Sequence, residues 1–240
     1  MNLRLDWCSH RDAKYAVEHW HYARRMPKFK QVYIGVWELN SFIGCVIFGL
    51  SVTPHLGDRF GLSSIECAEL TRIALKEHVS PVSRIGALAV KMINKQSPGL
   101  RLLVSYADPK QGHNGAIYQA MNWLYCGQSA KIRQYYWRGQ WRNDTPMFRA
   151  FKRDKEIKSQ TSYRDLPPKY KYLYPLDNEM RKQIEPLRKP YPKSVGSIAG
   201  DAMGFQSIEG GSIPTPTLQN FTGKEATIEP CPDMIIGLKE

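Results

Sequence analysis

The sequence lacks the cysteine pattern of a disulfide scaffold or of a zinc knuckle. Its 240 residues include five cysteines, none of which forms a C-x-x-C pair. An odd number of widely spaced cysteines is typical of a protein kept in a reducing compartment. We therefore predict free thiols, and we interpret Cys45 and Cys67, which lie among apolar residues, as small core residues.

Long apolar runs are also missing. No stretch approaches the roughly 18 consecutive apolar residues that a membrane-spanning helix needs. The first residues, MNLRLDWCSH, lack the apolar centre of a secretory signal. We expect a cytoplasmic protein with no membrane partner, and its 42% hydrophobic content is enough for one sizeable core.

Several catalytic signatures are absent as well. The chain has no G-x-x-x-x-G-K-[ST] phosphate loop, no G-x-S-x-G nucleophile elbow and no H-x-E…P-C-x-x-C deaminase pattern. It also has no methyltransferase-like glycine loop after a first strand. These absences argue against P-loop hydrolysis, α/β-hydrolase chemistry, zinc-dependent deamination and methyl transfer of that type.

Acidic residues are scarce in one part of the chain. The net charge is +12, and residues 128–193 carry 17 Lys and Arg against 7 Asp and Glu. Residues 1–127 carry 15 against 9, and residues 194–240 carry 2 against 6. Ten aromatic residues lie between Tyr135 and Tyr174. Cations for phosphates and rings for unstacked bases suit a nucleic-acid surface, which we favour over a solvated surface with packed tyrosines.

Hydrophobic periodicity predicts a mixed α/β sheet flanked by helices. Helices are indicated at 11–25, around 85–93, at 114–125 and at 178–187; a hairpin is indicated at 32–50; strands are indicated at 65–75, 100–108, 129–137 and 169–174. We predict an α/β core at 1–137 and a basic, aromatic-rich extension at 138–193 that packs on it. The glycine- and proline-rich segment 194–240 is expected to be a flexible, disordered tail.

Two predicted strands end in polar residues. One carries Thr71-Arg72 and the other carries Tyr106 and Asp108. Ligands in α/β sheets bind beyond the carboxyl ends of strands, so these ends mark a candidate site. An unpaired buried arginine is costly, which indicates that Arg72 has a functional or an ion-pairing role.

The order of these elements resembles the GNAT acyltransferase superfamily. The hairpin GVWELNSFIGCVIFG, the strand ELTRIAL leading into SRIGALAVKMI, and the segment LLVSYAD…IYQAMNWLYCG carry the resemblance. It implies a GNAT-like fold in which the end of a splayed strand and the N-terminus of the following helix hold an acyl-coenzyme pyrophosphate. Ser83, Arg84 and Gly86 are the matching positions here, and the loop keeps one glycine where the superfamily has more.

A narrower resemblance is to the Mom family of phage DNA-modification proteins. It is carried by HWHYARRMP (19–27), GVWE (35–38), ELTRIAL (69–75), SPVSR (80–84), SYAD (105–108) and GHNGAIYQAMNW (112–123). It implies a transferase that adds a carbamoylmethyl group to the exocyclic amine of adenine in double-stranded DNA. The adduct would protect phage DNA from restriction, inside the cytoplasm of a bacterial host.

Five residues are the candidate catalytic groups: His21, Tyr22, Arg72, Asp108 and Tyr118. Asp108 would accept a proton from the amine, Tyr118 would donate one or stack on the base, and Arg72 would polarise a carbonyl or steer a phosphate. Asp108 is equally a turn former, because Pro109 follows it. Tyr118 is equally a packing residue. His113 would complete an N,O triad with His21 and Asp108 if they converged, but we assign no metal.

The candidate DNA contacts lie in or near the basic extension. They are Arg133, Tyr136, Arg138, Trp141, Arg142, Lys152 and Arg153. Two kinds of donor are left open. The GNAT resemblance implies acetyl-coenzyme A or another acyl donor, whereas an aminoacyl donor is a candidate because the adduct has the atoms of glycinamide. An ordinary GNAT N-acyltransferase acting on a small-molecule or protein amine, and a non-catalytic DNA-binding protein, are the alternative functions.

Overall fold

The computed structural model describes residues 2–50, 56–143 and 161–192, all within one unit, Met1–Gly196. The predicted tail at 194–240 lies outside the described residues. The elements run β1 (Leu3–Trp7), α1 (His10–Trp20), β2 (Gln31–Glu38), β3 (Ser41–Gly49), η1 (Asp58–Phe60), β4 (Cys67–Leu75), α2 (Val82–Gln96), β5 (Leu102–Ala107), η2 (Pro109–Gln111), α3 (Ala116–Ala120), β6 (Leu124–Gln128), β7 (Ile132–Trp137), β8 (Gln140–Asn143), β9 (Tyr163–Leu166), β10 (Tyr170–Pro175), α6 (Asn178–Ile184) and η3 (Glu185–Leu187).

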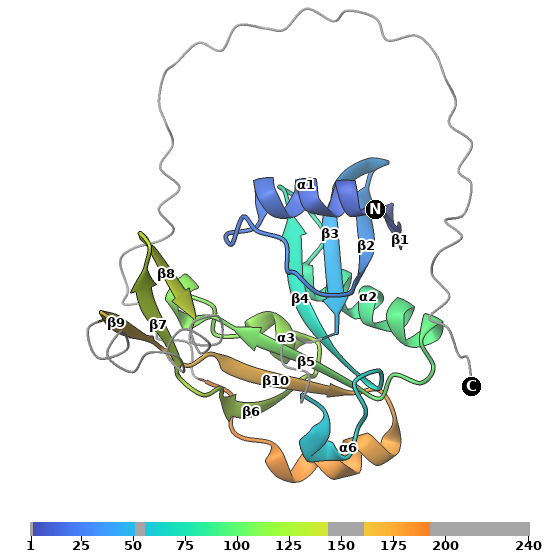
Figure 1. Ribbon diagram of the computed structural model, residues 1–240. Helices are drawn as coiled ribbons and strands as arrows, with labels where there is room; N and C mark the ends of the chain where they lie inside the picture. The colour runs from blue at the N-terminus through green and yellow to red at the C-terminus, as the bar shows by residue number, and fades with distance from the viewer. Residues whose placement is uncertain (1, 51–55, 144–160, 193–240) are drawn as a thin grey trace, which may run out of the picture. The chain divides into compact units, whose positions relative to one another are not determined.

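A seven-stranded sheet forms the centre of the unit, in the order β1-β2-β3-β4-β5-β10-β6 (Figure 1). Neighbouring strands are antiparallel except β4 and β5, which are parallel and are joined through α2. A parallel pair needs such a crossover, usually helical. The arrangement confirms the predicted GNAT-like fold class, a mixed α/β sheet flanked by helices.

Alternating strand residues pack against helices on opposite faces of the sheet. Val46 and Phe48 of β3 share a core with α2 and α3, whereas Cys45 and Ile47 of the same strand lie beneath α1. The face under α1 continues into a separate core formed by η1 and α6 over β5, β10 and β6. On that face, helix α1 therefore covers one part of the sheet and η1 with α6 covers the other, and the junction of β4 with β5 lies between these two parts.

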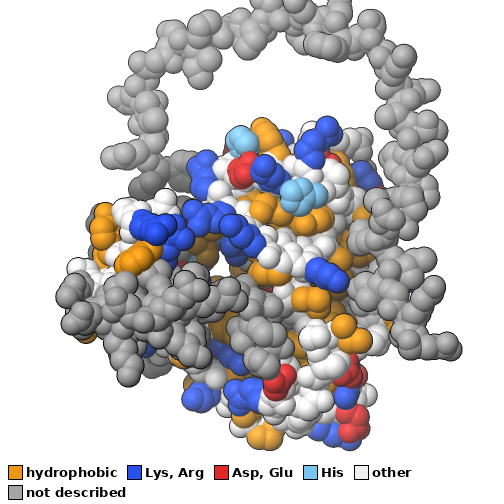
Figure 2. Space-filling view, in the orientation of Figure 1, with side chains coloured by type: hydrophobic (Ala, Val, Ile, Leu, Met, Phe, Trp, Pro, Cys, Tyr) orange, Lys and Arg blue, Asp and Glu red, His pale blue; other side chains and the backbone are white. Residues whose placement is uncertain are grey.

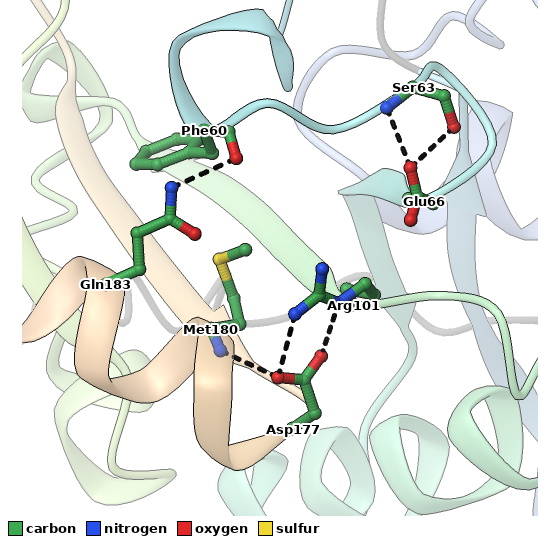
Figure 3. Close-up of polar contacts among 7 residues, drawn as sticks. All are labelled: Phe60, Ser63, Glu66, Arg101, Asp177, Met180 and Gln183. Atoms are coloured by element: carbon green, nitrogen blue, oxygen red, sulfur yellow. Dashed lines mark hydrogen bonds and ion pairs between the residues drawn. The ribbon is translucent and has the colours of Figure 1, made fainter.

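Helix α6 is tied to both of its neighbours by polar contacts (Figure 3). Asp177 caps its first turn by accepting from the Met180 N–H at 2.7 Å, and it also accepts from Arg101 Nε at 2.7 Å. Gln183 donates to the Phe60 carbonyl oxygen at 3.0 Å. These contacts fix α6 against η1 and the start of β5, so this end of the sheet has a closed cover.

Strand β10 comes from the basic segment but lies inside the central sheet, between β5 and β6. Tyr172 is completely buried there, and Tyr170 and Tyr174 pack against the same core. The tyrosines of the basic segment thus divide into those of the central sheet and those of a separate three-stranded antiparallel sheet, β8-β7-β9.

The predicted helix at 114–125 is wrong in length. Helix α3 covers only Ala116–Ala120, the backbone turns at Asn122 with φ of 59°, and β6 follows. Trp123 and Tyr125 pack on one face of the sheet and Leu124 on the other. That alternation has the period of a strand, which a run of apolar residues conceals in the sequence.

Candidate functional site

Strands β4 and β5 form an opening, here called the fork, where they stop pairing. Their register joins Cys67–Glu69 to Leu102–Val104, although the strands continue to Leu75 and Ala107. Ser105 lies just past the last pair, and its Oγ donates to the Leu70 carbonyl oxygen at 2.7 Å. A side chain therefore replaces the backbone ladder at the vertex of the fork, and beyond it backbone groups and side chains can face a ligand.

Tyr118 closes the fork from the α3 side. Its hydroxyl lies 2.7 Å from Ser105 Oγ, and the residue is only 8% exposed. Burial raises the Tyr118 pKa to about 12, against the opposing effect of the Ser105 hydrogen bond. Since the pKa lies far above neutrality, the phenol keeps its proton and is suited to donate it.

Arg72 reaches the fork from β4 next to a β-bulge. The β3–β4 register shifts between Ile47 and Phe48, which leaves Thr71 as the extra residue, and Thr71 Oγ1 donates to the Ile47 carbonyl oxygen at 3.1 Å. Bulges re-aim side chains beside functional sites. Arg72 Nη1 donates to the Thr71 carbonyl oxygen at 2.7 Å, whereas its buried Nε has no hydrogen-bond partner among the described residues. Such a donor can serve an incoming oxygen.

The residues that follow α1 place two rings, those of His21 and Tyr22, at the fork. The His21 and Tyr22 rings are 4.2 Å apart, and the Tyr22 ring lies 5.5 Å from the His113 ring in the loop after β5. Burial, together with the charges of Arg72 and His113, lowers the His21 pKa to about 4. His21 Nδ1 accepts from the Ala23 N–H at 3.0 Å, so the proton of the neutral ring is on Nε2. His21 is therefore a neutral donor at pH 7.

Asp108 sits at the end of β5 with its carboxylate already engaged. It accepts from the Lys110 N–H at 3.0 Å, as a turn former does, and pairs with Lys169 Nζ at 3.3 Å. Its carbonyl oxygen accepts from the His113 N–H at 3.3 Å, which joins it to the loop that carries His113. Both interpretations of Asp108 stay open, and its catalytic role remains a prediction.

Glu69 also lies at the fork, although it was not among the site residues predicted from the sequence. It is the last β4 residue paired with β5. Burial is the main influence on the pKa values of its neighbours, lowering that of Arg72 and raising those of Tyr106 and Tyr118, and the negative charge of Glu69 favours the protonated form of each. Its position inside an otherwise apolar strand, two residues before Thr71-Arg72, was the available signal. Glu69 is a second carboxylate at the fork.

Helix α2 begins at Val82 beside the fork. Its N-cap is Pro81, which has no side-chain acceptor, so the first turn has no side-chain cap. Free N–H groups and the helix dipole at such an end attract phosphates. Ser83 and Arg84 lie in that turn, whereas a side chain at Gly86 would meet Met121. Gly86 thus permits close packing of α2, and coenzyme contacts by the three residues remain predictions.

The predicted DNA contacts fall mainly on the small sheet. Arg133 and Tyr136 lie on β7, Arg138 lies in the turn, and Trp141 and Arg142 lie on β8. Arg133 makes two hydrogen bonds to Asp165, at 2.7 and 2.9 Å, so its charge is compensated. Lys152 and Arg153 lie outside the described residues.

The described residues carry neither a metal-binding cluster nor a membrane-spanning helix. No group of three or more His, Cys, Asp or Glu side chains in that part of the chain is arranged to hold a metal ion. None of its helices is long and apolar enough to cross a membrane.

Two of the solved structures that match this chain are acetyltransferases. An aminoglycoside acetyltransferase AAC(6')-Ib in complex with coenzyme A and kanamycin matches with a TM-score of 0.46 and 7% identity, over 77% of this chain and 99% of that one. An acetyltransferase from Thermus thermophilus matches with a TM-score of 0.41 and 14% identity, over 73% of this chain and 97% of that one.

Sequence comparison identifies relatives directly. Methylcarbamoylase mom of Escherichia phage Mu is 26% identical over 204 residues, which are 80% of this chain and 84% of that protein. The model of the Mom protein family matches residues 2–193. Because that match spans most of its length, the chain belongs to the Mom protein family.

Proposed function

We propose that this protein is a DNA-modifying transferase that places a carbamoylmethyl group on the exocyclic amine of adenine and so protects DNA from restriction. Membership of the Mom family and the similarity to a methylcarbamoylase support the proposal. The observation that carries it is the convergence of a protonated phenol, a half-buried arginine and a neutral histidine at the fork.

The acceptor sets the first requirement. The lone pair of the adenine amine is delocalised into the ring, so the amine is a poor nucleophile and must lose a proton when it reacts. A paired adenine must also leave the base stack, at a cost of about a few kcal/mol that stacking and polar contacts in the enzyme offset. Tyr22, about half exposed beside His21, is the ring best placed to stack on an extruded base.

An acyl donor fits the other side of the fork. Ser83 and Arg84, in the uncapped first turn of α2, would hold its phosphate groups. The donor, when bound, supplies the activated carbon unit for transfer. Acetyl-coenzyme A and an aminoacyl donor are the two candidates. An aminoacyl donor would contain all the atoms of the carbamoylmethyl group, whereas acetyl-coenzyme A would transfer an acetyl group and would need a second reactant to supply the amide nitrogen.

The residues of the chain then divide the proton transfers. Tyr118 gives a proton to the leaving group, because its raised pKa keeps it protonated at neutral pH. Arg72 stabilises negative charge with the Nε–H that has no partner among the described residues, and His21 adds a hydrogen bond from Nε2. Asp108 takes the proton of the amine, and Glu69 is the competing base.

Mass analysis of nucleosides from plasmid DNA tests the proposal in cells that express the protein. We expect modified deoxyadenosine with the wild-type chain and none with Asp108→Asn. Lys169→Met is the matched control, because it breaks the same ion pair and leaves the carboxylate in place. Glu69→Gln tests the competing base in the same assay.

The outcomes separate the alternatives. Unmodified deoxyadenosine with abundant, folded wild-type protein would contradict the proposed function. Equal loss of the adduct in Asp108→Asn and Lys169→Met would make Asp108 a structural residue. Loss in Glu69→Gln alone would transfer the role of base to Glu69.

A further inference from the structure

The small sheet has two unlike faces, because side chains alternate along each of its strands. The register pairs Tyr136 with Trp141, and Gln134 with both Asn143 and Arg164. These five residues share one side, here called the planar face, since each of them ends in a flat group. Arg133, Arg142, Tyr163 and Asp165 lie on the other side.

The planar face is held together by its own side chains. The Tyr136 and Trp141 rings are 5.3 Å apart, and the Arg164 guanidinium lies 4.3 Å above the Trp141 ring. Arg164 donates from Nε and Nη2 to Gln134 Oε1, at 3.0 and 2.8 Å, and Gln134 donates to Asn143 Oδ1 at 2.9 Å. The rings and the guanidinium are therefore oriented before any partner binds.

The two faces carry the same net charge, since Arg133 and Arg142 outweigh Asp165 by one on the other face, but within these strands only the planar face lacks an acidic residue. Asp165, the one acidic residue in β7, β8 and β9, makes its two hydrogen bonds to Arg133 on the opposite face. Arg164 on the planar face is instead stacked on an indole and bonded to a neutral amide. Within these three strands, the planar face thus offers a positive charge without an acidic neighbour on its own side, which is complementary to phosphate.

Exposure shows that the planar face is not a core surface. Tyr136 is 48% and Trp141 is 37% exposed, so large ring areas face solvent. Figure 2 shows Lys and Arg side chains gathered with hydrophobic ones over this hairpin, at the left of the view. Exposed aromatic faces interleaved with arginine are the stacking platforms of proteins that bind unstacked bases.

The hairpin has the shape needed to enter DNA. Strands β7 and β8 are joined by Arg138 and Gly139 alone, both with positive φ (49° and 75°), as in a type I′ turn. The result is a narrow two-stranded ribbon with an arginine at its tip, and the major groove admits such a ribbon.

We infer that the β7–β8 hairpin is a wedge that enters the major groove and stacks Tyr136 and Trp141 on the bases left unstacked when the target adenine is extruded. The inference rests on the proposed function, since it takes DNA adenine as the substrate. Arg164 contacts a phosphate beside the gap. The wedge acts on the duplex, whereas the fork acts on the extruded base.

The test compares one adenine in two states. An oligonucleotide duplex carries an adenine that the wild-type protein modifies, and a second duplex carries the same adenine opposite an abasic site, where extrusion costs less. We expect Trp141→Ala and Tyr136→Ala to slow modification of the paired adenine about 10- to 100-fold, from the loss of stacking on one base. Modification opposite the abasic site should stay within a few-fold of wild type.

Tyr163→Ala is the matched control. Tyr163 is 59% exposed on the same sheet but on the other face, so its loss should leave both rates unchanged. Equal slowing by Tyr163→Ala, or equal slowing of both substrates by Trp141→Ala, would overturn the wedge.

A second readout keeps the wedge separate from the chemistry. Fluorescence of 2-aminopurine placed next to the target rises when its neighbour leaves the stack, and we expect Trp141→Ala to abolish the rise that wild-type protein produces. If the wild-type protein gives the rise but no modified adenine, the proposed reaction fails and the wedge stands. If it gives modified adenine without the rise, the wedge fails and the reaction stands.

Discussion

Tyr118 in the fork and Tyr136 on the planar face are both tyrosines on the proposed path of DNA, yet one is 8% and the other 48% exposed. At the fork, burial in the surrounding core raises the pKa of Tyr118 and lowers that of His21. On the planar face, the side chains hold one another through cross-strand contacts and have water on one side.

Because the fork groups are buried and the planar-face groups are exposed, we expect the two regions to have different functions. A group buried at the fork has a defined proton, which suits it to act in a reaction step. A group on the planar face offers area and charge, which suits it to hold DNA. Substitutions at the fork should therefore change the rate of modification, and substitutions on the planar face should change how DNA is bound and opened.

The largest effect is expected from Tyr118→Phe. Loss of the group proposed to protonate the leaving group should slow single-turnover modification about 10²- to 10⁴-fold and leave the Kd for DNA unchanged. Tyr125→Phe is the control, because Tyr125 is a buried tyrosine of the same core on β6, away from the vertex. A weakened Kd with a normal rate would mean that the fork binds DNA in the manner proposed for the planar face.

The next effect concerns pH and stability at the fork. The His21 pKa is about 4 in the folded protein and about 6.5 in an unfolded chain. Because the unfolded chain binds this proton first, His21 costs stability as pH falls from about 6.5 to 4. The difference amounts to about 3 kcal/mol.

Urea unfolding at a series of pH values measures this effect. The variant His21→Asn keeps an acceptor for the Ala23 N–H but cannot titrate, so the acid-induced loss of stability should shrink by that amount. An unchanged pH profile in the variant would show that His21 is solvated, and the contrast between a buried fork and an exposed sheet would weaken.

Substitutions at two glycines, one near the fork and one in the β7–β8 hairpin, test the difference in packing between the two regions. Gly115, just before α3, has φ of +83°, and a side chain there would run into the Tyr172 ring; Gly139 in the hairpin turn has φ of +75° with open space around it. Gly115→Ala should cost about 2–4 kcal/mol, from strain plus a clash, whereas Gly139→Ala should cost about 1–2 kcal/mol from strain alone. Thermal unfolding measures both, and equal costs would contradict the difference in packing.

Much of the fork was predictable, because it follows from periodicity and from polar residues at strand ends. Arg72, Tyr118 and the His21-Tyr22 pair were all selected from the sequence, and the structure brings them to one place. The ion pair of Asp108 with Lys169 could not be predicted, since it depends on β10 pairing with β5 across a long separation in the chain. The short α3 was missed for a similar reason, because burial on two faces made Trp123–Tyr125 uniformly apolar.

The planar face was the harder region to predict. Composition located a basic, aromatic segment, but only the register shows which side of each strand a residue occupies. Arg133 was therefore selected although Asp165 compensates it, and Arg164 was passed over although it lies with the exposed rings. Charge counts cannot distinguish two arginines on opposite faces of one sheet.

The smallest predicted effect turns on this pair of arginines. Arg164→Gln should lower the slope of log affinity for DNA against log salt by about one, as expected for one lost phosphate contact, whereas Arg133→Gln should leave the slope unchanged. Both substitutions remove one charge from the same sheet, so net charge cannot explain a difference between them. An equal decrease in slope for both variants would mean that DNA affinity depends on the overall charge of the sheet. It would contradict the proposal that the planar face is the side that contacts the duplex.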